Sequence, residues 1–105
     1  MRRTASTGPA ALHGCASLFR ALANEERLRI LDQLLEGERR VSDLAGAAGV
    51  DISTLSQRLA VLRRQGLVCQ RRDGRNIYYS IAGNYVASLI KHARAHVREA
   101  QRAGR

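Results

Sequence analysis

The chain has 105 residues, of which 45% are hydrophobic, and this size and composition fit one folded domain. It carries 18 Lys and Arg against 9 Asp and Glu, and the net charge of +9 indicates a polyanionic partner, with nucleic acid ahead of an anionic membrane. No run of about 18 apolar residues is present, which excludes a transmembrane helix. Cys15 and Cys69 lie far apart and make no disulfide framework, so we expect a reduced, cytoplasmic setting.

The chain begins with small and polar residues over 1–9, which predict a flexible N-terminal arm. The remaining residues, 10–105, are expected to form a single domain. Within it, a weak first helix over 10–23 is indicated by apolar residues at helical spacing: Leu12, Leu18, Phe19 and Leu22.

A second helix is expected after Asn24, a residue typical of the N-cap position. Glu25 and Glu26 follow in the first turn, where the helix dipole favours anions. Gly37 ends this helix. Its apolar stripe consists of Leu28, Leu31, Leu34 and Leu35.

Two short helices come next, and the turn between them contains Gly49. We expect Ser42 to cap the third helix and Asp51 to cap the fourth, which extends over 51–66. The apolar face of the fourth helix is Leu55, Leu59 and Leu62. Two short helices joined by a turn that contains Gly are typical of a helix-turn-helix motif.

Residues 67–81 predict a two-stranded β-hairpin, or wing, because Asp-Gly stands between two β-prone runs. With Asp73-Gly74 as the turn, Arg72 pairs with Arg75, Cys69 with Tyr78, and Val68 with Tyr79. Alternation then places Val68, Ile77 and Tyr79 on one face of the hairpin. The other face holds Cys69, Arg71 and Tyr78.

A last helix is predicted over 84–102, opened by Gly83-Asn84. Its apolar face is Val86, Leu89, Ile90, Ala93, Val97 and Ala100. A long amphipathic helix at the end of a small chain is often a dimer seam. Taken together, the elements predict a mainly α chain with a winged helix-turn-helix.

The segments LANEERLRIL, LSQRLAVLRRQGLV and RRDGRNIYYSI resemble the ArsR/SmtB family of bacterial metal-responsive repressors. The resemblance covers about Leu18 to Ile81. It implies about five helices, a two-stranded wing, and a homodimer joined through the first and last helices. It also implies repression relieved by an inducer of unknown identity. The residues expected at the dimer interface are Leu12, Val86, Leu89, Ile90, Ala93 and Val97.

Double-stranded operator DNA is the expected partner, with the start of the fourth helix in the major groove. Gln can bond adenine, Arg can bond guanine or phosphate, and Ser and Thr suit either. The candidate contacts on this helix are Ser53, Thr54, Ser56, Gln57, Arg58, Arg63 and Arg64. Those on the wing are Arg71, Arg72, Arg75 and Asn76. An ordinary solvated helix face is the alternative for the first group.

No metal site of the family is complete in this sequence. The family's Cys-x-Cys pair before the third helix corresponds to Arg40 and Ser42, so an arsenic, lead or cadmium site is rejected there. A second family site is half present as His96 and Glu99, but Gly83 and Tyr85 replace its other half. A divalent metal ion remains a candidate cofactor for two sets: His92, His96 and Glu99, or His13, Cys15, His92 and His96. A solvated helix edge is the alternative.

Redox sensing is the alternative signal. Some family members use one cysteine in the second helix and one in the last, but Asp32 stands in the second-helix segment. Cys15 and Cys69 fall in other elements. Oxidation of Cys69 beside Arg71 could loosen the wing, whereas a plain structural thiol is the simpler interpretation.

Other classes of function make different predictions from DNA binding. A winged helix used for protein–protein contact would show no salt-dependent DNA affinity. An enzyme is not expected, because no Ser/His/Asp set, carboxylate pair or phosphate loop is present. A membrane-surface role is weak, since the last helix carries no aromatic residue beyond Tyr85 on its apolar face.

Overall fold

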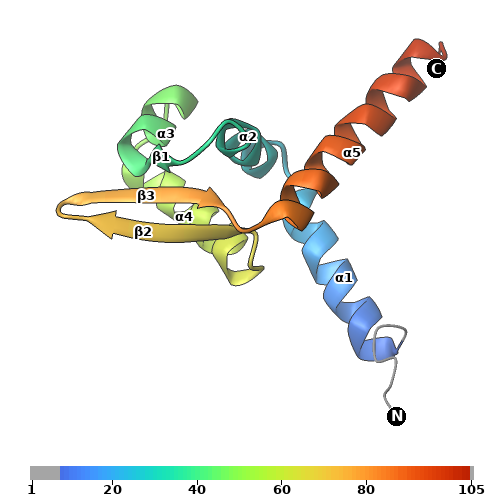
Figure 1. Ribbon diagram of the computed structural model, residues 1–105, viewed down its shortest axis with the longest axis horizontal. Helices are drawn as coiled ribbons and strands as arrows, with labels where there is room; N and C mark the ends of the chain where they lie inside the picture. Colours follow the sequence, from blue (N-terminus) through green and yellow to red (C-terminus); the bar gives the residue numbers. More distant parts are fainter. Residues whose placement is uncertain (1–7, 105) are drawn as a thin grey trace.

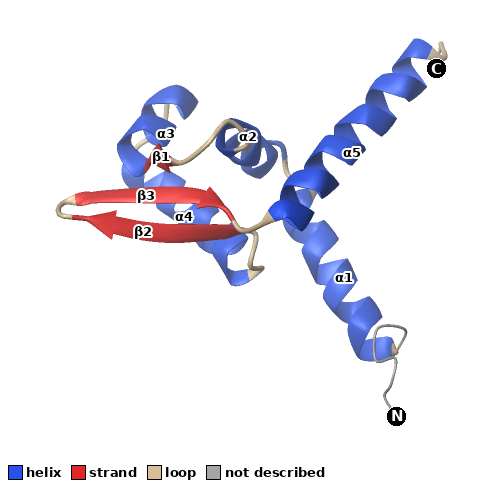
Figure 2. Cartoon of the chain, in the orientation of Figure 1, coloured by secondary structure: helices blue, strands red, loops and turns tan. Residues whose placement is uncertain are grey.

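The computed structural model describes residues 8–104 (Figure 1, Figure 2). In chain order the elements are α1 (Pro9–Leu22), α2 (Glu25–Leu34), β1 (Arg39–Arg40), α3 (Val41–Ala48), α4 (Ile52–Arg64), β2 (Val68–Asp73), β3 (Asn76–Ile81) and α5 (Asn84–Arg102). This order is a winged helix-turn-helix, with five helices in the described residues, as the sequence predicts. The proposed arm over 1–9 falls outside these residues except for Gly8 and Pro9, and Pro9 already opens α1.

Side chains cap two helices as predicted. The Thr54 backbone N–H donates to Asp51 Oδ1 at 2.7 Å, and the Arg27 N–H donates to Asn24 Oδ1 at 2.9 Å. The prediction for Ser42 is wrong, because α3 begins at Val41 and no side chain caps it. The chain passes directly from β1 into α3, so Arg40 occupies the N-cap position and Ser42 lies inside the helix.

The wing belongs to a three-stranded antiparallel sheet in the order β1-β3-β2. The sequence predicts two strands only. Strand β1 consists of two residues, both arginine, so it has neither the length nor the apolar alternation that marks a strand in a sequence. It pairs with β3 through Arg39 opposite Tyr79 and Arg40 opposite Tyr78.

The predicted hairpin register is wrong. Asp73 pairs with Asn76, so the turn is Gly74-Arg75, and Cys69 lies opposite Ser80 instead of Tyr78. Gly74 has a φ of 63°, and a glycine with positive φ at the first central position suits a tight hairpin turn. The observed pairing is shifted by two residues along β3 relative to the predicted pairing, so each side chain remains on the face predicted for it.

The hydrophobic core joins the helix-turn-helix to the base of the wing. Leu31, Leu44, Leu55, Leu59 and Leu62 are its most buried large side chains. Val68 and Tyr79 add the core-facing side of the wing, at 4% and 6% exposure. The predicted faces of α4 and of the hairpin are therefore confirmed, and α4 is held by its core leucines with its opposite side free.

Helices α1 and α5 diverge from this body, away from the wing (Figure 1). In α5 only Ile90 is buried, and every residue from Lys91 to Gly104 is exposed. The radius of gyration is 15.8 Å, against about 13 Å for a compact chain of this length. The open shape comes from these two helices, whose outer parts extend away from the helix-turn-helix body (Figure 1).

Candidate nucleic-acid interface

The start of α4 presents a polar surface. Successive residues of an α-helix are rotated by about 100°, and the core leucines define the buried direction. Ser53, Gln57 and Arg64 therefore point most directly away from the core, and all three are exposed. Ser56 is exposed on one edge of this face.

Two of the predicted contacts on α4 lie closer to the protein. Thr54 and Arg58 are half-buried on the opposite edge of the helix. Arg58 lines a small hollow of about 130 Å³ between α2, α3 and α4, together with Glu26 and Gln33. Ser53 and Gln57 thus form the centre of the outward face, with Ser56 on one edge and Arg58 flanking the other.

Cations stand at both ends of the surface formed by α4 and the wing. Arg63 and Arg64 are exposed in the last turn of α4, where positive charge also stabilises the helix dipole. At the other end, Arg72, Arg75 and Asn76 are exposed at the tip of the wing. Within the described residues, the side chains of Arg72 and Arg75 make no hydrogen bond or ion pair, so these guanidinium groups are available to an anion.

Arg71 differs from its neighbours because its guanidinium has an internal partner. Arg71 Nε donates to Glu38 Oε2 at 2.9 Å, and the terminal nitrogen Nη2 donates to Oε1 at 2.7 Å. The same guanidinium lies 4.5 Å from the centre of the Tyr78 ring. The hydrogen bonds from Arg71 lower the pKa of Glu38 below its usual 4.5. The pair spans 33 positions in the sequence, so no local pattern announces it.

An ion pair occupies the place where the family resemblance would put metal-binding thiolates. Arg40 donates from Nε and Nη2 to the two carboxylate oxygens of Asp43, at 3.3 Å each. This hydrogen bonding raises the pKa of Arg40. A guanidinium repels a cation and Ser42 supplies no thiolate, so these residues do not fit a thiophilic metal.

The other candidate metal ligands are scattered. His13 and Cys15 are exposed on α1, and His92 and His96 are exposed on α5. Glu99 accepts a hydrogen bond from Arg102 at 3.3 Å. Over residues 8–104, no three His, Cys, Asp or Glu side chains form a group that could hold a metal ion.

Neither cysteine has a partner that would make it a redox pair within the chain. Cys15 and Cys69 are both free and exposed, and they lie on α1 and β2. The cation expected to activate Cys69 is Arg71, but its guanidinium is directed to Glu38. The Cys69 thiol therefore lacks the free neighbouring charge on which the redox hypothesis depended.

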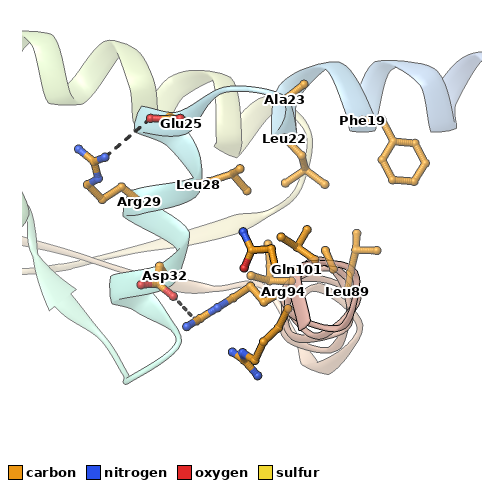
Figure 3. A pocket seen from close by; sticks show the side chains of 14 residues that line it. Phe19, Leu22, Ala23, Glu25, Leu28, Arg29, Asp32, Leu89, Arg94 and Gln101 are labelled. Carbon is orange, nitrogen blue, oxygen red and sulfur yellow. Dashed lines mark hydrogen bonds and ion pairs between the residues drawn. The ribbon is translucent and has the colours of Figure 1, made fainter. Parts of the chain in front are cut away.

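An apolar groove of about 820 Å³ lies between α1, α2 and α5 (Figure 3). Phe19, Leu28, Leu89 and Val97 line it, and Phe19 and Val97 are 56% and 52% exposed. Leu28 was expected on the inner stripe of α2, but it is 39% exposed in this groove. Apolar side chains left this open by one chain indicate a protein interface.

The residues predicted for dimerisation differ in how far their side chains are exposed in the single chain. Leu12 is 66% exposed and Ala93 is exposed, whereas Val86 and Leu89 are half-buried. Ile90, in contrast, is 4% exposed and packs in the core of its own chain.

Ion pairs border the groove. Arg94 on α5 pairs with Asp32 on α2, and Arg29 pairs with Glu25 at 4.0 Å (Figure 3). Asp32 stands where a sensing cysteine would be expected from the family resemblance. Here it links the helix-turn-helix body to α5 through charge, and no local pattern in the sequence indicates Arg94 as its partner.

This fold and this surface define a class of protein. A helix-turn-helix whose second helix presents an exposed polar face, beside a wing with free arginines at its tip, is a winged-helix DNA-binding protein. In the described part of the chain, no helix is long and apolar enough to cross a membrane.

Comparison with known proteins gives the family. The model of the bacterial regulatory protein arsR family matches residues 24–69. A transcriptional repressor SmtB homolog from Synechocystis sp. is 45% identical over 84 residues, which are 80% of this chain and 64% of that protein. The match thus spans slightly less than two thirds of this relative.

Solved structures agree with the sequence match. A homodimeric winged helix-turn-helix DNA-binding domain from Mycobacterium bovis is 39% identical, with a TM-score of 0.86 over 94% of this chain and 91% of that one. The antimony-specific transcriptional repressor AntR is 31% identical, with a TM-score of 0.78 over 97% and 92%. The chain belongs to the ArsR family of bacterial transcriptional regulators, and the relatives that it matches are regulators and not enzymes.

Proposed function

We propose that this chain is a cytoplasmic repressor of transcription that binds an inverted-repeat operator as a homodimer. One observation carries the proposal: the exposed polar face at the start of α4 lies in the same body as a wing tip with two unpaired arginines. In this arrangement α4 enters the major groove, where Gln57 reads a base edge. Arg72 and Arg75 bind phosphate or the minor groove beside it.

The second copy is expected to cover the apolar groove between α1 and α5. Phe19, Leu28 and Val97 are exposed there and would be buried by a partner. In a symmetric dimer the two α4 helices would meet successive major grooves, about 34–36 Å apart. An inverted repeat with half-sites one helical turn apart is therefore the expected operator.

The inducer is proposed to act elsewhere than at α3. AntR is described as antimony-specific. Where the family resemblance would put thiolates, this chain holds the Arg40–Asp43 ion pair. Two metal hypotheses remain: a divalent ion held by His92, His96 and Glu99 of α5, or one shared by histidines of α5 and residues of a partner's α1. Zinc and nickel are the ions to test first, because imidazole suits both.

Fluorescence anisotropy with labelled DNA from upstream of its own coding sequence tests the proposed function. Tight binding that weakens steeply with salt and exceeds the affinity for unrelated DNA is expected. Binding without salt dependence, or none at all, would instead favour the protein–protein module. The titration is then repeated with zinc, nickel, arsenite, persulfide and peroxide, and a metal chelator. Release by arsenite would contradict the reasoning about α3.

A further inference from the structure

The middle of the wing carries a row of side chains across all three strands. Tyr78 on β3 lies opposite Arg71 of β2 on one side and opposite Arg40 of β1 on the other. The Arg71 guanidinium lies against the Tyr78 ring and continues to the carboxylate of Glu38, directly before β1. One side chain of the outer strand is thus fastened to the opposite edge of the sheet.

The position of this row along the wing matters for what it can do. Tyr78 is the last residue of β3 towards the tip that pairs with both β1 and β2. Beyond it, Ile77 and Asn76 pair with β2 alone. The tip therefore projects as a two-stranded ribbon from the Arg71–Tyr78 pair. At about 3.3 Å per residue, a small tilt at Arg71 acts over roughly 10 Å at Gly74.

We propose that Arg71 is a positioning residue that aims the wing at DNA through Glu38 and Tyr78 and does not itself bind phosphate. This rests on the proposed DNA-binding function. Its charge is neutralised by a bidentate carboxylate, and a phosphate approaching it would meet the repulsion of Glu38. Strand β1 leads directly into α3, so the brace joins the wing to the helix-turn-helix and holds Arg72 and Arg75 in position relative to α4.

Glu38→Gln distinguishes a positioning role of Arg71 from direct contact with phosphate, because the two roles predict opposite changes in DNA affinity. Replacing Glu38 by Gln removes a negative charge near the interface. If Arg71 were a phosphate contact, the substitution would free it, tighten DNA binding and steepen the salt dependence. If Arg71 aims the wing, Glu38→Gln loosens the tip and weakens binding.

The test measures Kd against salt for a labelled duplex that the wild-type protein selects from a random pool. Arg71→Ala and Glu38→Gln are each expected to weaken binding about five- to tenfold with the salt slope unchanged. The charge-reversed double variant Glu38→Arg with Arg71→Glu should recover most of that loss. Tighter binding by Glu38→Gln, or a shallower slope for Arg71→Ala, would overturn the proposal.

Two matched controls separate this role from general charge effects. Arg72→Ala makes the same charge change one residue away, and it should lower the salt slope. Glu36→Gln removes another acid of the same loop, paired with Arg39 at 2.8 Å, and should not weaken binding. A Glu36→Gln loss equal to that of Glu38→Gln would contradict the brace.

A second measurement needs no DNA and so distinguishes failure of the brace from failure of the proposed function. Backbone order parameters of the wing are measured by NMR in the free protein. In Arg71→Ala and Glu38→Gln, the order parameters at the tip should fall while those of α4 stay unchanged, which also verifies the fold. Unchanged order parameters at the tip, even with a wild-type protein that binds no DNA, would refute the positioning role.

Discussion

At the scale of single residues, side chains that are neighbours in the sequence have different roles on one surface, because they contact different partners within the protein. Gln57 is exposed on the outward face of α4, whereas Arg58, the next residue, is half-buried against α2. Arg72 is free, whereas Arg71 is held by Glu38. Residue type alone cannot separate these roles, because each depends on the direction of the side chain and on what it meets.

Gln57→Ala is expected to relax sequence preference. A side-chain amide can bond adenine bidentately, and each such pair contributes about 1–3 kcal/mol of discrimination between bases. Affinity for the selected duplex should therefore fall towards that for unrelated DNA, while the salt slope changes little. Competition between selected and random duplexes measures the ratio. If the ratio is unchanged, Gln57 reads no base.

Arg75→Ala is expected to weaken binding to every sequence. Each lost phosphate contact reduces the slope of log Kd against log salt by about 0.9, so a dimer with two wings should lose roughly two. Arg102→Ala serves as the control, since it makes the same charge change at the far end of α5 (Figure 1). Equal salt slopes for the two variants would show that the wing tip does not contact DNA.

At the scale of elements, α4 depends on its first turn, where the Thr54 N–H lowers the pKa of Asp51 below its usual 3.8. A lowered folded-state pKa stabilises the protein above the unfolded value, and this contribution is lost as the pH falls through the folded value. Asn also caps helices but does not titrate. The free energy of unfolding of the wild type, relative to Asp51→Asn, should therefore be constant near neutrality and decline below about pH 4. A flat difference down to pH 2 would show that the Asp51 cap contributes nothing through its charge.

The elements that could be predicted from the sequence are those that depend on residues close together in the chain. Asn24 and Asp51 cap their helices by bonding the backbone three residues on, and both were identified. The leucines of α4 follow the helical period and were correctly placed in the core. Such features need only neighbours in the chain, so a single sequence carries them.

The elements that were missed depend on distant partners. Residues 39–40 form a strand because they pair with β3. Arg71 is not available to an anion because it is paired with Glu38. The observed hairpin register differs from the predicted one by two residues, because the turn residues are Gly74-Arg75 and not Asp73-Gly74. The faces of the wing were nevertheless predicted correctly, since alternation is preserved by a shift of two residues.

At the scale of the whole molecule, the open shape of the single chain and the separation of its apolar groove from the arginines of α4 and the wing indicate an assembly. The molecule measures 46 × 45 × 21 Å, with α1 and α5 diverging on the side away from the wing (Figure 1). The groove beside them is lined by exposed apolar side chains, whereas the free arginines of α4 and the wing lie elsewhere. One surface thus remains for a second copy while the other remains for DNA.

Val97→Glu tests this division. In an isologous interface the substitution occurs twice, and each carboxylate would be buried among apolar side chains, which is costly. The variant should therefore be monomeric by sedimentation velocity. A monomer reads one half-site without the effective concentration that a joined pair supplies, so operator affinity should fall by about 100-fold or more.

Ala95→Glu is the matched control for Val97→Glu. Two residues along a helix are about 200° of rotation, so Ala95 lies on the side of α5 opposite to Val97, and it is exposed. It makes the same change in charge and places the same side chain on the same helix, but it faces solvent in the proposed dimer. Ala95→Glu should remain dimeric and bind DNA nearly as the wild type does, because Val97 lines the groove and Ala95 does not. If both variants stay dimeric with equal affinity, the seam lies elsewhere, and the groove between α1, α2 and α5 must be left open for a different partner.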